Sequence, residues 1–394
     1  MIIFLIAAIS FNLSRGLREG KTLKFLSRLE YKVRTFKEQV GAFVEFRFFK
    51  LARQASRGFL IQVWECLWGW VRYGLLPKSY YNYRMYEDYT PLRKKVKAYI
   101  SDNIYFSKLG QVNMRNNVVL SNKWVFHNYF DKYPVLLPKC WGYFHKNGGI
   151  WKDTGETFGF EDLPKIFLRM DGHKVVIKPI RGSSGARIVV ADIHSEGDAV
   201  FLLISGTKVP LVEFAQNFKR TNYIIEDRLL QHDDLNAIYP QAVNSIRINT
   251  LNDTTGVKLW GAIIKLGTSG AEIDNWGKGS LCVGIDMDSG KMLTGSYDIH
   301  FSNTIMAPFS VHPDTKAQFE GVQLPYWQEL KATVCQAAKM APILPYIAWD
   351  VAITPEGPCI IEGNGRSDLS MVQVHGGLRN QEIIEWWRQF GIKI

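Results

Sequence analysis

The chain has 394 residues, of which 46% are hydrophobic and 22% are charged. These values are those of an ordinary folded protein and exclude an intrinsically disordered chain, and the length suits two or three structural units. Lysine and arginine exceed aspartate and glutamate by 11. Because residues 1–100 hold 19 basic and 7 acidic residues, the whole excess lies in the first quarter and predicts an anionic partner there, either a membrane surface or a nucleic acid.

The first ten residues form an apolar run about half as long as a bilayer-spanning segment, and the first basic residue, Arg15, follows it. Residues 23–51 repeat apolar side chains at spacings of three and four, as an amphipathic helix does, with basic residues between them. Together with the tryptophan-rich stretch 59–71, this pattern predicts either contact of residues 1–72 with an anionic membrane surface, or packing of the apolar stripe on the protein's own core or on a second copy. The sequence contains no recognisable nucleic-acid-binding module, so we expect no nucleic-acid partner.

Five cysteines are scattered along the chain without a Cys-x-x-Cys pair. This usage is typical of reduced thiols in a cytoplasmic protein and argues against a disulfide framework or a zinc site. They are Cys66, Cys140, Cys282, Cys335 and Cys359.

Beyond residue 121 the pattern alternates between strands and helices, which predicts the α+β class. Before it, the tyrosine-rich residues 74–91 suggest a linker or a capping segment, followed by a helix to residue 100. The elements expected in chain order are a helix at 122–133, an extended piece at 133–138, a hairpin of strands 175–178 and 187–191, a short helix at 210–220, strands at 223–226, 245–251 and 258–266, a helix at 332–340, and a hairpin of strands 349–354 and 359–362.

The first hairpin carries a lysine just before a turn of glycines and serines. Lys178 ends the first strand, and Gly182, Ser183, Ser184 and Gly185 form the turn. A cation beside several backbone N–H groups is what a polyphosphate needs, although the lysine precedes the glycines, unlike the lysine of a Gly-x-x-x-x-Gly-Lys loop. The alternative interpretation is an ordinary hairpin turn.

The last hairpin carries two carboxylates and an amide. Strand alternation places Asp350 on one face, and the tight turn at residues 355–358 brings Glu362 and Asn364 alongside it. Such a set suits Mg²⁺, which prefers oxygen ligands and shares its shell with substrate phosphates. An ordinary hairpin with solvated acids is the alternative, but a carboxylate that follows three apolar residues is costly to bury without a cation.

Taken together, residues 122–371 resemble the ATP-grasp superfamily. Gln231-His232 and the run from Asn244 to Thr250 resemble its sugar-transfer-associated branch, which is found among bacterial polysaccharide genes and is similar to alpha-L-glutamate ligase-related proteins. The resemblance implies the ATP-grasp fold for residues 101–394, with two α+β subdomains that clamp ATP, at about 120–225 for nucleotide clamping and about 226–394 for metal binding. Residues 1–100 share no motif with the family and are expected to form a basic, helical amino-terminal region.

The resemblance also implies roles for individual residues. The ATP phosphates would be held by Lys123, which follows Asn122 where the family has aspartate, by Lys178, and by the loop from Gly182 to Gly185. A hinge segment would bind adenine through Glu226, Asp227 and Leu229, and the ribose would be bound by Asp233, or less well by Asp234. Mg²⁺ would be bound by Asp350, Glu362 and Asn364, with the family's two-residue interval between the last two.

The catalytic cations implied by the resemblance are Arg247 and Lys265. Many ligases of this fold have an arginine just before the first metal aspartate, where this chain has Trp349, so Arg247 or Arg366 is expected to supply that charge. Arg366 and Asp368 are the first candidates for contact with the acceptor. The glycine-flanked residues 270–279 are either a mobile flap over the substrate or a plain surface loop.

The resulting functional hypothesis is an ATP- and Mg²⁺-dependent carboxylate–amine or carboxylate–thiol ligase that forms an acyl phosphate. Its partner would be a carboxylate-bearing small molecule or glycan acceptor, such as a cell-surface polysaccharide precursor. Two alternatives stay open: a kinase that phosphorylates a hydroxyl of a sugar or lipid-linked glycan, and a non-catalytic ATP-binding membrane adaptor. We expect a cytoplasmic protein with peripheral contact on the cytoplasmic membrane face, and the sequence leaves a homo-oligomer open.

Overall fold

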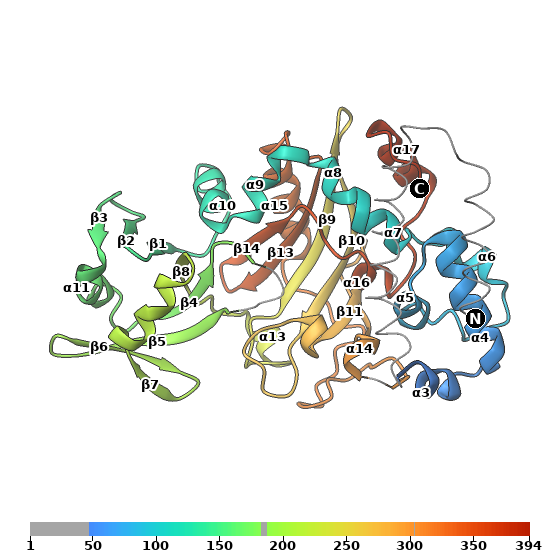
Figure 1. Cartoon of the computed structure of the whole chain (residues 1–394), viewed down its shortest axis with the longest axis horizontal. Helices are drawn as coiled ribbons and strands as arrows, with labels where there is room; N and C mark the ends of the chain where they lie inside the picture. The colour runs from blue at the N-terminus through green and yellow to red at the C-terminus, as the bar shows by residue number, and fades with distance from the viewer. Residues whose placement is uncertain (1–46, 183–186, 303) are drawn as a thin grey trace, which may run out of the picture.

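The computed structural model describes residues 47–182, 187–302 and 304–394. Two antiparallel β-sheets lie side by side along the long axis of the molecule, and the helices of residues 47–100 lie beyond the second sheet (Figure 1). Helices and antiparallel sheets are mixed along the chain, so the predicted α+β class is confirmed.

The first sheet has eight strands in the order β3-β2-β1-β8-β4-β5-β6-β7. Helices α11 (Leu163–Leu168) and α12 (Leu211–Phe214) pack on it, and the fully buried rings of Phe144, Phe167 and Phe218 lie in the core between them. The strands are β1 (Cys140–His145), β2 (Gly148–Trp151), β3 (Thr157–Gly159), β4 (Lys174–Pro179), β5 (Val189–Glu196), β6 (Ala199–Ile204), β7 (Thr207–Pro210) and β8 (Tyr223–Asp227).

The second sheet has six strands in the order β12-β11-β10-β9-β13-β14. Alternation along β13 sends Ile347, Trp349 and Val351 into the core under helix α15 (Trp327–Lys339) and sends Asp350 to the opposite face. The predicted two-faced strand is therefore confirmed. The strands are β9 (Ser245–Asp253), β10 (Gly256–Leu266), β11 (Leu281–Ile285), β12 (Met292–Ser296), β13 (Tyr346–Thr354) and β14 (Gly357–Asn364).

Short helices connect and flank the two sheets. Helix α10 begins at Lys123, and the side chain of Asn122 caps it by accepting hydrogen bonds from two of the first free N–H groups. The short helices from residue 102 onwards are α7 (Asp102–Ile104), η3 (Tyr105–Leu109), α8 (Gly110–Val112), η4 (Met114–Asn117), α9 (Val118–Ser121), α10 (Lys123–Phe130), η5 (Phe160–Asp162), η6 (Ala215–Lys219), α13 (Asp233–Asn236), η7 (Trp276–Lys278), α14 (Ile299–Ser302), α16 (Ser370–Gln373) and α17 (Gln381–Gln389).

The amino-terminal helices have a core of their own. Four buried tyrosines form it with Leu75 and Leu92, and Ile299 of α14 closes it from the second sheet's side. The predicted linker at residues 74–91 is therefore wrong, whereas the alternative of a capping segment holds, because the aromatic side chains are too apolar to stay in water. The helices are α3 (Arg47–Gln54), α4 (Phe59–Trp68), η1 (Gly69–Tyr73), α5 (Pro77–Asn82), α6 (Leu92–Lys95) and η2 (Val96–Ala98), and the tyrosines are Tyr80, Tyr81, Tyr83 and Tyr86.

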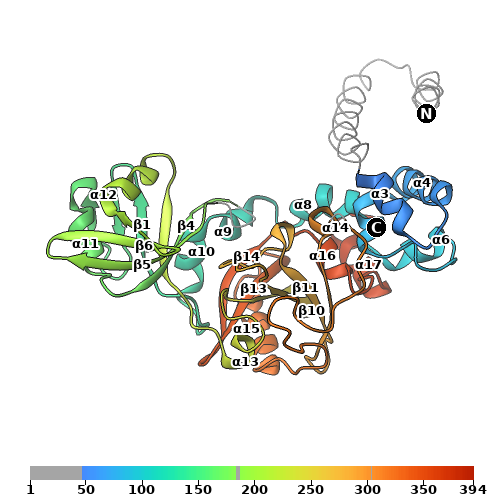
Figure 2. The same cartoon turned by 90° about the horizontal axis from the view of Figure 1, so that it is seen from below.

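Buried polar contacts fasten this helical unit to the rest of the chain, and those of Gln373 and Asn82 are two examples. The buried amide of Gln373 in α16 accepts a hydrogen bond from the N–H of Ile100 and donates one to its carbonyl, at 2.7 and 3.0 Å. The side-chain carbonyl of Asn82 accepts a hydrogen bond from the N–H of Ile299. The view from below shows the helical unit against the end of the second sheet that carries α14, α16 and α17 (Figure 2).

Asp102 is a buried carboxylate at the start of α7, and it predicts a pH dependence of stability. It accepts hydrogen bonds from Ser79 Oγ, Tyr105 Oη and the N–H of Leu76, but burial outweighs them and raises its pKa from 3.8 to about 6. Because the pKa is higher in the folded protein than in the unfolded chain, proton binding stabilises the fold. This stabilisation is complete below the unfolded pKa of 3.8 and is lost as the pH rises through 6. We expect a loss of about 2 to 3 kcal/mol between pH 4 and pH 7 from this group.

Urea unfolding of the wild type and of Asp102→Asn over this pH range tests the expectation. The asparagine variant should have a lower overall stability but a flatter pH dependence, because it cannot take up the proton. Parallel pH curves for the two proteins would show that Asp102 titrates as an ordinary carboxylate.

Several predicted elements differ from the structure in extent. Helix α15 begins at Trp327 instead of residue 332, because its first turn buries Trp327 and Leu330. Strands β1 to β3 were not predicted, since β1 is buried on both faces and shows no alternation. Of the helix predicted at 23–51, only the part in α3 lies in the described residues.

Candidate functional site

A cleft that is open to solvent lies between the two sheets, and its volume is about 180 Å³. Strands β4, β5 and β8 of the first sheet supply one wall, and β9, β10, β13 and β14 of the second supply the other. The lining combines apolar side chains with a set of charged ones, as small-molecule sites usually do. The apolar residues are Pro138, Val176, Ile188, Val190, Leu229, Val243, Ile273 and Ile361.

On the wall of the first sheet, Lys178 and Glu226 form a buried ion pair. Lys178 Nζ lies 2.5 Å from Glu226 Oε2, and His127 of α10 lies 2.6 Å from the other carboxylate oxygen. Burial by itself would raise the pKa of Glu226, but the two neighbours lower it to about 2. The pKa of Lys178 stays above its usual value, because Glu226 outweighs the effect of burial. This lysine is thus a fixed, charged group on the cleft wall.

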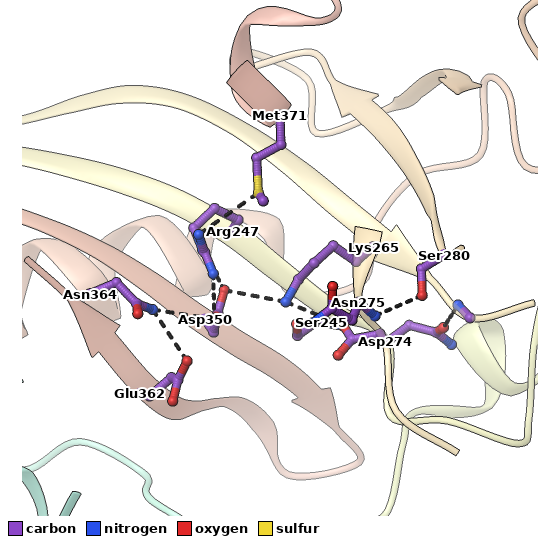
Figure 3. Close-up of polar contacts among 12 residues, drawn as sticks. Ser245, Arg247, Lys265, Asp274, Asn275, Ser280, Asp350, Glu362, Asn364 and Met371 are labelled. Atoms are coloured by element: carbon purple, nitrogen blue, oxygen red, sulfur yellow. Dashed lines mark hydrogen bonds and ion pairs between the residues drawn. The ribbon is translucent and has the colours of Figure 1, made fainter. Parts of the chain in front are cut away.

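On the wall of the second sheet, Arg247 and Asp350 face each other on paired strands. Their Cα positions are directly opposite in the β9–β13 ladder, and the guanidinium donates to both carboxylate oxygens at 2.6 and 2.7 Å (Figure 3). Lys265 of β10 lies 3.6 Å from the same carboxylate. Although burial favours the neutral acid, these two cations keep the pKa of Asp350 well below its usual value.

Glu362 and Asn364 lie beside Asp350 on the neighbouring strand β14. Asp350 and Glu362 are directly opposite in the ladder, and the amide nitrogen of Asn364 lies 3.4 Å from Asp350 Oδ2 and 3.3 Å from Glu362 Oε1 (Figure 3). Lys123 Nζ lies 3.4 Å from Glu362. The three predicted metal-binding side chains therefore converge on one spot.

The loop at residues 270–279 contributes a carboxylate whose place in the cleft was not predicted. Asp274 accepts hydrogen bonds from the N–H and the hydroxyl of Ser245, and it lies 3.6 Å from Lys265 (Figure 3). Burial, only partly offset by Lys265 and Ser245, raises its pKa above the usual value. Glu272, Ile273 and Asn275 also line the cleft. An aspartate inside a glycine-flanked loop was the only signal in the sequence.

The structure brings most of the predicted residues together and leaves others apart. The cleft lining includes Lys178, Glu226, Asp227, Leu229, Arg247, Lys265, Asp350 and Glu362. Asp233 is exposed at the start of α13 and is not part of the lining. Arg366 and Asp368 follow β14 and also lie outside it, although the intervening Ser367 accepts a hydrogen bond from Arg247 at 2.9 Å. Gly182 is described with a φ of 149°, and Ser183, Ser184 and Gly185 fall outside the described residues.

His127 is a second residue that sequence reasoning missed, whereas His232 bonds to the backbone of α13. His127 is buried and holds Glu226 from α10, a contact between residues 99 positions apart. His232 precedes α13, and its Nδ1 accepts a hydrogen bond from the N–H of Asp234. Among the described residues, no group of three or more histidine, cysteine or acidic side chains is placed to hold a metal ion. The predicted set has only two carboxylates, and its third member, Asn364, is an amide.

A family model described as sugar-transfer-associated ATP-grasp matches residues 106–385. The solved structures similar to this chain include the ADP complex of an N5-carboxyaminoimidazole ribonucleotide synthetase, with 12% identity, a TM-score of 0.36, and coverage of 64% of this chain and 46% of that one. D-Alanine–D-alanine ligase from Bacillus anthracis has 13% identity, a TM-score of 0.35, and coverage of 69% and 67%.

A third similar structure is the ATP-grasp ligase PsnB complexed with minimal precursor, Mg and ADP, with 10% identity, a TM-score of 0.34, and coverage of 70% and 58%. The chain spans about half the length of the synthetase, 46%. No curated protein sequence matches this chain.

Proposed function

Because this chain belongs to the sugar-transfer-associated ATP-grasp family, we propose that it binds ATP with Mg²⁺ in the cleft between its two sheets and uses it to join a carboxylate to an amine or a thiol. The observation that carries the proposal is the convergence on one cleft of three buried cations and two carboxylates. The cations are Lys178, Arg247 and Lys265, and the carboxylates are Asp350 and Glu362, both of which the amide of Asn364 contacts.

The cleft lining offers both an apolar surface and charged groups, as the base and the phosphates of a nucleotide require. Val176, Val190 and Ile361 offer an apolar surface to a flat base. Both carboxylate oxygens of Glu226 are already engaged by Lys178 and His127. We therefore assign to Glu226 the task of holding Lys178 in place, and to the backbone of residues 227–229 the contact with the base. Lys123 and Lys178 would bind the phosphates, together with the turn that follows Gly182.

The charge of the cleft supports a metal ion beside the phosphates. Six acidic and four basic side chains line it, so a triphosphate without a cation would meet a net negative surface. Rotation of the Asn364 amide exchanges its N–H for its oxygen, which completes an oxygen set with Asp350 and Glu362 that fits Mg²⁺. When bound there, the ion would neutralise phosphate charge as it is transferred.

The proposed chemistry needs positioned charges and no protein nucleophile. A substrate carboxylate oxygen attacks the γ-phosphorus of ATP, and ADP leaves. The amine nitrogen then attacks the carbonyl carbon of the acyl phosphate, a C–N bond forms, and phosphate leaves as the nitrogen gives up a proton. Arg247 and Lys265 would stabilise the transferred charge. Burial raises the pKa of the Cys359 thiol to about 12, so this nearby cysteine stays protonated and takes no part.

The acceptor side of the reaction would lie near the end of β14. Ser367 bonds to Arg247, so the segment that carries Arg366 and Asp368 is tied directly to a cleft cation. We propose that these two residues contact the acceptor, which the family description suggests is a carboxylate-bearing or sugar-linked molecule such as a polysaccharide precursor. Contact with an anionic membrane surface on the cytoplasmic side is the remaining part of the proposal. No described helix is long and apolar enough to cross a bilayer.

Product analysis tests the proposal. The purified chain is incubated with ATP labelled at the γ-phosphate, Mg²⁺, carboxylate-bearing sugars or sugar lipids, and hydroxylamine as a trapping amine. We expect a hydroxamate, ADP and labelled free phosphate. A labelled phosphate ester that forms without any amine would identify a kinase and overturn the ligase proposal. ATP binding without turnover of any such acceptor would favour a non-catalytic adaptor.

A further inference from the structure

A row of exposed apolar side chains runs along one side of the continuous helix formed by α4 and η1. Leu60, Trp64, Trp68 and Val71 are spaced by four, four and three residues and so share one face. Leu60 is 79% exposed and Trp64 is 63% exposed, and the rings of Trp64 and Trp68 stack at 5.9 Å. The opposite side of the helix is buried and carries polar residues. This row is here called the aromatic stripe. A contiguous exposed apolar surface of this kind usually marks a site of contact with another molecule or with a membrane.

A basic pocket of about 410 Å³ begins where the aromatic stripe ends. Val71 is the last residue of the stripe, and the next residue, Arg72, lines the pocket with Arg93, Lys97 and Arg379. The lining contains no aspartate or glutamate. Arg379 is fixed in place by donating hydrogen bonds to the carbonyls of Lys97 and Ile394.

The pocket and the stripe are parts of one packed unit. Gly69 of η1 lies against Leu92 of α6, where even an added methyl carbon would stand 3.3 Å from the leucine side chain. This close approach brings α6, with Arg93 directly after Leu92, to the end of the helix that carries the stripe. The backbone positions of Arg93 and of the helix that carries the stripe are therefore set by the same packing contact.

We propose that this pocket binds the phosphate headgroup of an anionic membrane lipid while the aromatic stripe enters the lipid interface. Tryptophan prefers the boundary between headgroups and acyl chains, and clustered arginine and lysine bind lipid phosphate. The site rests on the part of the proposed function that places the protein on an anionic membrane surface. Binding of lipid at this site does not depend on ATP turnover in the cleft, so the two can be tested separately.

Charge argues for a lipid over the other occupants of this surface. Residues 47–100 hold 11 basic and 3 acidic residues, so a second copy would bring the same positive excess to a positive pocket. Residues 1–46 hold 8 basic and 4 acidic residues and have the same disadvantage. An anionic lipid surface supplies both the negative charge and the apolar layer that the stripe requires.

Vesicle cosedimentation of the full chain tests the site. The vesicles contain phosphatidylcholine alone or with phosphatidylglycerol, at fixed ionic strength. Each basic residue near an anionic surface contributes about fivefold to binding, so Arg93→Glu with Lys97→Glu should weaken binding to the anionic vesicles by at least tenfold. The control, Lys146→Glu with Lys165→Glu, makes the same change in net charge on exposed residues of the first sheet's part and should change binding by no more than about twofold.

A second pair of variants tests the stripe. Trp64→Ser with Trp68→Ser should weaken binding at least tenfold, whereas Val212→Ser with Leu230→Ser, which removes side chains 74% and 75% exposed elsewhere, should leave it unchanged. Equal losses in both charge variants would overturn the site, because net charge alone would then explain binding. A dimer that the tryptophan variant dissociates would identify a second copy as the occupant. Equal binding to both kinds of vesicle, with millimolar glycerol phosphate bound by the wild type but not by Arg93→Glu with Lys97→Glu, would identify a soluble anion. Either result would overturn the lipid assignment.

Discussion

We expect Glu362→Ala to lower Mg²⁺-dependent ATP turnover by at least about 100-fold, the usual effect of removing one group that stabilises transferred charge. Glu362 lies directly opposite Asp350 and beside Asn364. Its loss would leave only one carboxylate and one amide to bind the Mg²⁺ ion, instead of two carboxylates and an amide. The fold should tolerate the change. The carboxylate is 30% exposed, on a strand at the edge of the second sheet.

The measurement is ADP release against Mg²⁺ concentration, with unfolding by urea followed in parallel. Glu356→Ala is the matched control, since it removes the same charge from the exposed turn of the same hairpin. It should retain nearly full turnover. Unchanged turnover and Mg²⁺ dependence in Glu362→Ala would remove this side chain from the proposed metal set.

Lys178→Ala should lose both ATP binding and stability, and the two losses have different causes. ATP binding falls because the cation on the cleft wall is gone. Stability should fall by about 3 to 5 kcal/mol, since the variant leaves the carboxylate of Glu226 buried without its main partner. A simple loss of activity in this variant would therefore be ambiguous.

The double variant Lys178→Met with Glu226→Gln separates the two causes. It removes both charges together, so urea unfolding should recover at least half of the lost stability, while isothermal titration should still detect no Mg²⁺·ATP binding. If ATP affinity returns together with stability, Lys178 serves only as the structural partner of Glu226.

The parts of the site that depend on local pattern could be predicted from the sequence. Alternation on β13 and a short turn are enough to bring Asp350 and Glu362 onto neighbouring strands, because both residues belong to one hairpin. Their direct pairing also needs the β-bulge between Asp350 and Val351, without which the regular register would put Asp350 opposite Ile361. The same holds for Lys178 at the end of β4. These predictions rest on contacts within about 15 residues of chain, where strand geometry leaves little freedom.

Long-range partners could not be predicted in this way. Arg247 and Asp350 are 103 positions apart, and Glu226 and His127 are 99 apart. Their contacts are fixed by the order of strands in each sheet, which a single sequence does not reveal. The sequence left residues 270–279 open as a flap over the substrate or a surface loop, and the hydrogen bonds of Asp274 to Ser245, which bring this loop to the cleft, are long-range contacts of the same kind. The sequence left residues 74–91 open as a linker or a capping segment, because the core that their tyrosines share includes Ile299, which lies far along the chain.

The side chain of Gln373 has a consequence for how this protein can change by recombination. The family match begins at residue 106, yet the amide of Gln373 satisfies both backbone groups of Ile100, and Tyr83 also bonds to it. A cut at residue 106 would leave the backbone groups of Ile100 on one part and the amide of Gln373 on the other without their hydrogen-bond partners. The helical unit and α16 therefore behave as one structural piece, and we expect an exchanged helical unit to stay stable only when α16 is exchanged with it.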